Sequence, residues 1–205
     1  LKESGLKNLK INKKKFIYLI SPNKISSKFY KNLESILKTK KVSFFQMRLK
    51  KYSIKNKILI GEKIKKICKK NNVKFLVNDD PFLAKELNAD GCHLGQKDSN
   101  IFEARTIIGN KIIGITCHNS LNLAKIAIKN KSSYLAFGAF FPTKTKKAKH
   151  KAQIKVLSKV RKLTKTPIVA IGGINDSNYK KLLLNKVNFL AISGYIWNNK
   201  KYKPL

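Results

Sequence analysis

Eight short apolar runs, separated by longer amphipathic stretches, constrain the fold of this chain more than any other feature of its sequence. Each run has four to six residues that are mostly β-branched or aromatic, a pattern typical of buried parallel strands. Between the runs, apolar residues recur at helical spacing, most clearly in Lys55–Lys70, Leu121–Lys129 and Ile154–Leu163. The eight runs are Phe16–Ile20, Val42–Met47, Lys74–Val77, Gly91–Leu94, Ile112–Thr116, Tyr134–Gly138, Pro167–Ile171 and Phe189–Ile192.

Alternating strands and helices predict a parallel sheet, and eight repeats predict that it closes into a (βα)₈ TIM barrel. The fold class is therefore α/β, with one barrel domain over residues 16–205 after a polar, basic N-terminal extension over residues 1–15. An open doubly wound sheet is the alternative. Its nucleotide-binding versions usually carry a glycine-rich loop after the first strand, where this chain has Ser21-Pro22-Asn23.

The chain is strongly basic, with 46 lysine and arginine residues against 10 aspartate and glutamate residues and a formal net charge of +36. Such a surface attracts nucleic acids and anionic lipids. Only Arg48, Arg105 and Arg161 are arginines, whereas specific reading of bases relies on arginine forks. Because the lysines are spread along the whole chain, we expect no specific nucleic-acid partner. No apolar run reaches the roughly 18 residues that span a membrane, so we expect no membrane partner.

Three cysteines, Cys68, Cys92 and Cys117, lie far apart in the sequence. An odd number without close spacing argues against a disulfide framework or a zinc site. We expect all three to be structural thiols in a reducing cytoplasm. The polar segment 1–15 also lacks the apolar core of a secretion signal.

Basic and amide side chains follow the second apolar run, at the edge where a barrel carries its catalytic groups. Gln46, Arg48 and Lys50 alternate along the chain, so a strand would point all three to one side. Two cations and an amide can grip a diphosphate there. The alternative is a surface strand with ordinary basic residues.

Acidic residues are scarce, yet they gather after the third and fourth runs. Asp79 and Asp98 fit a magnesium site, since this ion prefers one or two carboxylates completed by phosphate oxygens. The alternative is turn chemistry, to which we assign Asp80, because it precedes Pro81 and is placed to cap the next helix.

Hydroxyls and glycines follow the last three runs. Barrels often bind phosphate with the loops after strands seven and eight, through glycine amides and a helix N-terminus. Hydroxyls beside a lysine also suit phosphate oxygens. The residues in question are Thr143, Lys144, Thr145 and Lys146 after the sixth run, Gly172 and Gly173 after the seventh, and Ser193 and Gly194 after the eighth.

The three histidines do not have the spacing of a metal triad. We interpret His93, inside the fourth run, as a core histidine with satisfied hydrogen bonds. His118 follows the fifth run and is placed to touch a substrate, whereas we expect His150, in a lysine-rich loop, to be solvated.

These motifs occur in an order that resembles the thiamine phosphate synthase family. The similarity extends from about Phe16 to Trp197 and therefore covers most of the chain. The motifs are Gln46-x-Arg48-x-Lys50, Asn78-Asp79, the run from Ala89 to Asp98 with His93-Leu94-Gly95-Gln96, Gly114-Ile115-Thr116, Phe137-Gly138, Pro142-Thr143-Lys144-Thr145-Lys146 and Ala170-Ile171-Gly172-Gly173-Ile174.

The resemblance implies a transferase on a (βα)₈ barrel, which joins hydroxymethylpyrimidine diphosphate to a thiazole phosphate and releases pyrophosphate with Mg²⁺. It assigns the metal to Asp79 and Asp98, and it is compatible with a homo-oligomer. The residues that it assigns to substrate binding are Gln46, Met47, Arg48, Leu49, Lys50, Asn78, Thr116, Thr143, Lys144, Thr145, Lys146, Gly173, Ile192 and Ser193, with Arg48, Lys50, Thr116 and Lys146 also assigned to catalysis.

Two positions depart from the family pattern: Leu49 replaces a common acidic residue, and Thr116 replaces the usual serine. Two alternative functions remain open. One is a thiazole tautomerase on the same barrel, which needs no metal and would use His118 as its acid–base group. The other is an inactive copy with incidental affinity for nucleic acid.

Overall fold

The computed structural model describes residues 16–143 and 150–199 of the 205-residue chain. The predicted N-terminal extension, residues 1–15, and the predicted ligands Lys144, Thr145 and Lys146 lie outside the described residues. No helix in the described part of the chain is long and apolar enough to cross a membrane.

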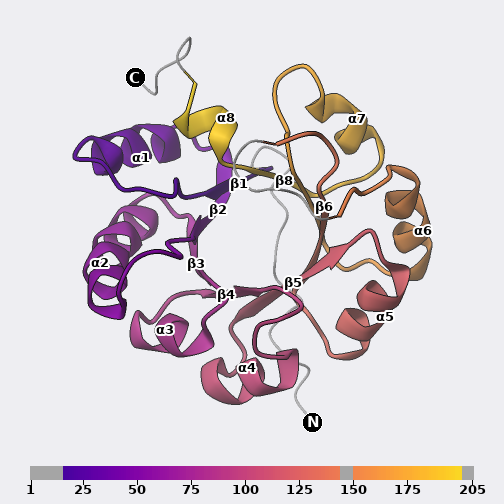
Figure 1. Cartoon of the computed structure of the whole chain (residues 1–205), viewed down its shortest axis with the longest axis horizontal. Helices are drawn as coiled ribbons and strands as arrows, with labels where there is room; N and C mark the ends of the chain where they lie inside the picture. Colours follow the sequence, from indigo (N-terminus) through magenta and orange to yellow (C-terminus); the bar gives the residue numbers. More distant parts are fainter. Residues whose placement is uncertain (1–15, 144–149, 200–205) are drawn as a thin grey trace.

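Eight parallel strands form a closed barrel, in which each strand pairs with its neighbour in sequence and β8 returns to β1 (Figure 1). The predicted α/β fold class and (βα)₈ barrel are thereby confirmed. All eight apolar runs form strands, with bounds that differ by two residues at most. The strands are β1 (Ile17–Ile20), β2 (Val42–Met47), β3 (Lys74–Asn78), β4 (Gly91–Leu94), β5 (Ile112–His118), β6 (Tyr134–Gly138), β7 (Ile168–Ile171) and β8 (Phe189–Ile192).

A helix follows each strand, and in Figure 1 the helices form an outer ring around the barrel. The last and shortest one lies between the first and the seventh, beside the junction of β1 and β8. The helices are α1 (Phe29–Lys38), α2 (Ile54–Lys70), α3 (Pro81–Glu86), α4 (Ile101–Ile108), α5 (Leu121–Lys129), α6 (Lys155–Leu163), α7 (Tyr179–Leu184) and α8 (Gly194–Trp197).

Alternation of side chains along the strands divides the core into two apolar layers. The larger layer lies between strands and helices. It contains the three cysteines, which are free and buried as predicted for structural thiols. Burial raises the pKa of each thiol, to about 12 for Cys92 and Cys117, so these cysteines are poor nucleophiles. The smaller layer fills the barrel interior, and its buried members are Tyr18, Ile20, Phe44, Leu76, Tyr134, Ala136, Val169, Phe189 and Ala191.

Candidate active site

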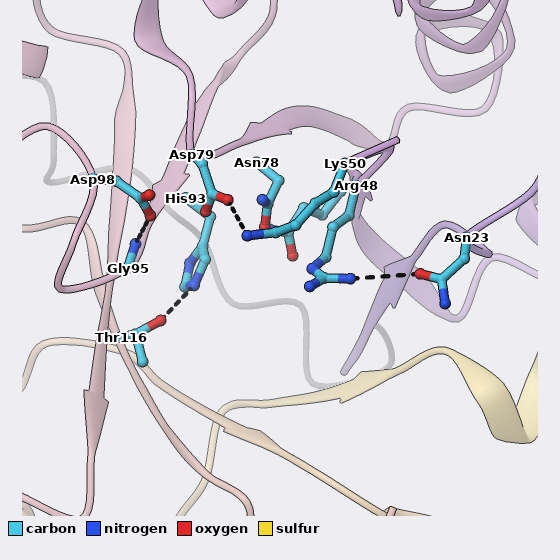
Figure 2. A network of polar contacts seen from close by, with 10 residues as sticks. Asn23, Arg48, Lys50, Asn78, Asp79, His93, Gly95, Asp98 and Thr116 are labelled. Atoms are coloured by element: carbon cyan, nitrogen blue, oxygen red, sulfur yellow. Dashed lines mark hydrogen bonds and ion pairs between the residues drawn. The ribbon is translucent and has the colours of Figure 1, made fainter. Parts of the chain in front are cut away.

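Arg48 and Lys50, just after β2, extend to the same side, as the alternation predicts (Figure 2). Gln46 is only 2% exposed, and its Nε2 donates a 2.7 Å hydrogen bond to Asn78 Oδ1 at the end of β3. The backbone N–H of Arg48 donates to Ser21 Oγ, and its guanidinium Nη1 donates to Asn23 Oδ1 at 3.5 Å. The loop after β1 therefore holds Arg48 through both its backbone and its side chain.

The intervening residues Met47 and Leu49 point the other way. Both side chains are buried in the layer between the barrel and the helices. A contribution of these two positions to substrate binding would therefore come from their backbone groups. Leu49, at one of the two positions where the sequence departs from the expected family pattern, is thus part of the apolar core.

Asp79 is held in an unusual conformation immediately after β3. Its φ is +66°, a left-handed value that Asp adopts more readily than most residues. The N–H of Asp79 donates to the carbonyl of His93 on the neighbouring β4, and its Oδ2 lies 2.7 Å from Lys50 Nζ. Burial alone would raise the pKa of Asp79, but hydrogen bonds from Lys50 and Asp98 lower it below its usual value.

Asp98 approaches the same point from the loop after β4. Its Oδ2 accepts a 2.7 Å hydrogen bond from the N–H of Gly95, and a Cβ at Gly95 would meet that oxygen at 2.8 Å. Burial and the neighbouring Asp79 carboxyl raise the pKa of Asp98, although the Gly95 hydrogen bond opposes the change. Each carboxyl therefore changes the ionisation of the other, and a bound cation would relieve the repulsion between them.

This pair fits a magnesium ion better than a softer metal. Oxygen ligands from one or two carboxylates, completed by water and substrate phosphate, are the usual coordination of Mg²⁺. The described residues contain no group of three or more His, Cys, Asp or Glu side chains able to hold a metal by themselves. Such an ion at Asp79 and Asp98 would therefore depend on substrate oxygens.

Asp80 has a different role from Asp79, although it is the next residue in the sequence. Its Oδ1 accepts a hydrogen bond from Leu83 N at the start of α3, and Pro81 occupies the first helical position. The prediction that Asp80 caps this helix is therefore confirmed, and its carboxylate is committed to the helix.

Thr116, near the end of β5, completes this side of the site (Figure 2). The amide of Gln96 donates to the Thr116 carbonyl, and His93 Nε2 lies 2.9 Å from Thr116 Oγ1. His93 also contacts the Tyr134 hydroxyl, so both ring nitrogens have partners and the expectation of a satisfied histidine is confirmed. Gln96 has no role in the sequence-based assignment, although it lies within the motif that contains His93.

The ends of β6, β7 and β8 supply the second group of predicted ligands. Gly173 has a φ of +62°, and a Cβ there would lie 2.2 Å from the carbonyl oxygen of Pro142, so the loops after β6 and β7 meet at a position where only glycine fits. Ser193 Oγ donates to the carbonyl of Ser21. Ile192 packs at the margin of the outer core.

Ser21 connects the two groups of ligands, and sequence reasoning missed it. This serine is 3% exposed. Its Oγ accepts from Arg48 N, while its carbonyl accepts from Ser193 Oγ. The only available signal was a polar residue directly after the first apolar run, which on its own indicates a turn as readily as a site.

His118 and His150 lie together, with ring centroids 4.1 Å apart. His118 ends β5 with a φ of +52°, and His150 is exposed, as predicted. The contact joins the end of β5 to the segment that leads into α6. Whether His118 touches a substrate stays a prediction.

Taken together, the fold and the site define a class: a (βα)₈-barrel enzyme with cations, amides and a carboxylate pair at the carboxyl ends of β2 to β4. A sequence model of the thiamine monophosphate synthase family matches residues 17–196. The chain belongs to this family.

Individual relatives agree with the family match. A thiamine-phosphate synthase of Pelagibacter ubique is 67% identical over 201 residues, 98% of this chain and 97% of that protein. A thiamine-phosphate synthase of Rhodospirillum centenum is 36% identical and is covered to 89%, as is this chain. The structure of a thiamine phosphate pyrophosphorylase from Pyrococcus furiosus aligns with a TM-score of 0.82 at 29% identity, over 93% of this chain and 90% of that one.

Proposed function

We propose that this chain is a thiamine phosphate synthase, a transferase that condenses hydroxymethylpyrimidine diphosphate with a thiazole phosphate. The products are thiamine phosphate and pyrophosphate. The observation that carries the proposal is the convergence of Arg48, Lys50 and the Asp79–Asp98 pair at one edge of the barrel. Two cations and a carboxylate pair in one place suit a diphosphate that arrives with a divalent metal.

The reaction transfers an alkyl group. The thiazole nitrogen forms a bond to the pyrimidine methylene carbon while the carbon–oxygen bond to the diphosphate breaks, and the electron pair of that bond leaves with pyrophosphate. No protein nucleophile is required. The barrier therefore depends on how well the site stabilises negative charge on the leaving group and aligns the two substrates.

The residues divide these tasks. Arg48 and Lys50 place positive charge beside the leaving diphosphate, and the loop after β1 keeps Arg48 in place through Ser21 and Asn23. A magnesium ion held by Asp79 and Asp98 would add further neutralisation of the same charge. Lys146, whose predicted role is also at the diphosphate, lies outside the described residues.

The amide pair and the second group of ligands orient the substrates. Because Gln46 Nε2 donates to Asn78 Oδ1, the Gln46 oxygen and the Asn78 nitrogen are left to accept from and donate to the pyrimidine diphosphate. Thr143, Gly173 and Ser193, at the ends of β6, β7 and β8, would hold the phosphate of the thiazole, Ser193 through its backbone N–H because its hydroxyl donates to Ser21. We place the reaction in the cytoplasm, because the three free thiols suit a reducing compartment.

Release of pyrophosphate by the purified chain tests this proposal. We expect release only when both substrates and Mg²⁺ are present, with thiamine phosphate formed in equal amount. A thiazole tautomerase would instead shift the double bond of the thiazole without the pyrimidine or a metal. Conversion of the thiazole alone, with no pyrophosphate, would replace the proposed function by the isomerase.

A further inference from the structure

A row of four hydrogen-bonded side chains, Tyr18, Tyr134, His93 and Thr116, crosses the interior of the barrel from β1 to β5. The hydroxyls of Tyr18 and Tyr134 lie 2.8 Å apart. The Tyr134 hydroxyl is 2.9 Å from His93 Nδ1, and His93 Nε2 is 2.9 Å from Thr116 Oγ1. Both tyrosines are at most 2% exposed, so the row starts deep in the apolar interior and ends at a predicted substrate ligand.

A glycine makes this arrangement possible. His93 of β4, Gly114 of β5 and Tyr134 of β6 are in register on three adjacent strands. A Cβ at Gly114 would lie 1.8 Å from Cζ of Tyr134. Because position 114 has no side chain, the tyrosine ring crosses over β5 and stacks on His93, with centroids 5.7 Å apart and planes inclined by 10°.

The tautomer of His93 follows from the number of hydrogen-bond donors in this row of side chains. Among the described residues, the Tyr18 hydroxyl has Tyr134 as its hydrogen-bond partner. If His93 carried its proton on Nδ1, either Tyr18 or Tyr134 would be left with a buried O–H that has no acceptor, which is costly. All donors are satisfied when Tyr18 donates to Tyr134, Tyr134 donates to Nδ1, and Nε2–H donates to Thr116 Oγ1.

This direction determines what Thr116 offers to a ligand. Its oxygen already accepts from His93 Nε2, so its own O–H is left to donate. Burial lowers the pKa of His93 to about 4, although the negative charge of Asp79 opposes the change. Nε2 donates to Thr116 in the neutral ring with its proton on Nε2 and in the doubly protonated ring alike, so the direction of this bond does not depend on the charge of His93.

We propose that His93 is a positioning residue that holds the Thr116 hydroxyl as a hydrogen-bond donor toward the bound diphosphate. The proposal rests on the proposed function, because Thr116 is a predicted ligand of the pyrimidine diphosphate. A diphosphate oxygen only accepts hydrogen bonds, so a threonine with the reverse polarity would repel it. The inner residues Tyr18 and Tyr134 act through His93 and do not touch the substrate.

A double-mutant cycle between His93 and Thr116 tests this role. His93→Asn keeps an amide near the position of Nδ1 but cannot reach Thr116, whereas His93→Gln places an amide donor near Nε2. We expect His93→Asn to lower kcat/KM for the pyrimidine diphosphate by about tenfold, and His93→Gln to recover most of that loss. In a Thr116→Val background, His93→Asn should cost less than about twofold, because the hydroxyl it positions is gone.

A purely structural histidine gives a different result. Equal losses from His93→Asn in both backgrounds, or an equal loss for His93→Gln and His93→Asn, would overturn the proposal. If the His93 variants fail to fold, Tyr134→Phe replaces them, since it keeps the ring and removes only the donor to Nδ1. Its loss, expected to be about threefold, should likewise vanish with Thr116→Val, and persistence of the loss counts against the role.

The inference and the proposed function fail in different ways. The same cycle can be measured by calorimetric titration of pyrophosphate with Mg²⁺, which requires no turnover. An inactive wild-type chain that binds pyrophosphate with coupled His93 and Thr116 would reject the proposed function and keep the positioning role. An active chain without coupling would reject the positioning role alone.

Discussion

The two halves of the barrel mouth are built differently. At the ends of β2 to β4, charged and amide side chains contact one another directly, through Gln46–Asn78 and Lys50–Asp79, and the carboxyls of Asp79 and Asp98 influence each other's ionisation. At the ends of β6 to β8, the described residues offer hydroxyls, backbone groups and the tight approach at Gly173. The first half suits a metal and a highly charged leaving group, whereas the second suits a phosphate that only has to be held.

The largest expected effect comes from the carboxylate pair of the charged half. Asp98→Asn keeps an acceptor for Gly95 N–H but removes the negative charge, so we expect kcat to fall by about 100-fold or more and the Mg²⁺ requirement to rise. Steady-state assays of pyrophosphate release across Mg²⁺ concentrations measure both. Asp80→Asn makes the same chemical change at a helix cap and should leave kcat nearly unchanged. Near-normal activity of Asp98→Asn would remove this residue from the metal site.

The charged half also contains an interior group that should make folding depend on pH. Unfolded His93 binds a proton near pH 6.5, whereas the folded pKa is about 4. Between these values the unfolded state holds more protons, so the free energy of unfolding should fall as the pH is lowered from 6.5 to 4. The loss is at most about 3 kcal/mol, at about 1.4 kcal/mol per pKa unit.

Denaturant unfolding at several pH values, with wild type and His93→Gln compared, isolates this contribution. The variant should lose less stability than wild type over the same range, whatever its stability at neutral pH. If the free energy of unfolding depended on pH equally in both proteins, His93 would already take up its proton in the folded state within this pH range. Beneath the other half, the barrel interior contains Val169, Phe189, Ala191 and Tyr134. Burial raises the pKa of Tyr134 well above its usual value, so we expect no such dependence between pH 4 and 6.5 from this half.

Adjacent lysines separate a specific role from general charge. Lys50 and Lys51 are both exposed in the turn after β2, but Lys50 forms a 2.7 Å ion pair with Asp79. Lys50→Gln should lower kcat/KM for the pyrimidine diphosphate by about tenfold to 100-fold, the size of a charge-assisted hydrogen bond. Lys51→Gln removes the same charge and should change kcat/KM less than twofold. Equal effects of the two changes would mean that only the overall positive field matters.

The fold and the charged half were predictable because their signals are local. Each strand is a short, mostly apolar run, and Asp79 and Asp98 lie in the loops that follow two neighbouring runs, so closure of the barrel brings them together. Met47 and Leu49 belong to the same motif as Arg48, but alternation turns their side chains into the core. When a whole motif is assigned to substrate binding, the assignment therefore includes positions whose side chains face away from the site.

The interior row of side chains and the serine connection were not predictable from the sequence. Tyr18 and Tyr134 are 116 residues apart, and each one reads as an ordinary member of an apolar run. Their contact depends on the exact register of β4, β5 and β6 and on the missing side chain at Gly114. Likewise, the connecting role of Ser21 depends on the pairing of β8 with β1, which brings the Ser193 hydroxyl to the Ser21 carbonyl.

The smallest effect is expected in the second half, to which we assign the phosphate of the thiazole. The Ser193 hydroxyl donates to the Ser21 carbonyl, so Ser193→Ala should act by loosening the loop after β8, whose backbone N–H groups would face the phosphate. We expect the KM of the thiazole phosphate to rise about fivefold, which corresponds to about 1 kcal/mol, and the KM of the pyrimidine diphosphate to stay unchanged. Ser158→Ala, on the exposed face of α6, serves as the control. If Ser193→Ala raised both KM values equally, the contact of Ser193 with Ser21 would transmit the change to Arg48, and the two halves would be one site.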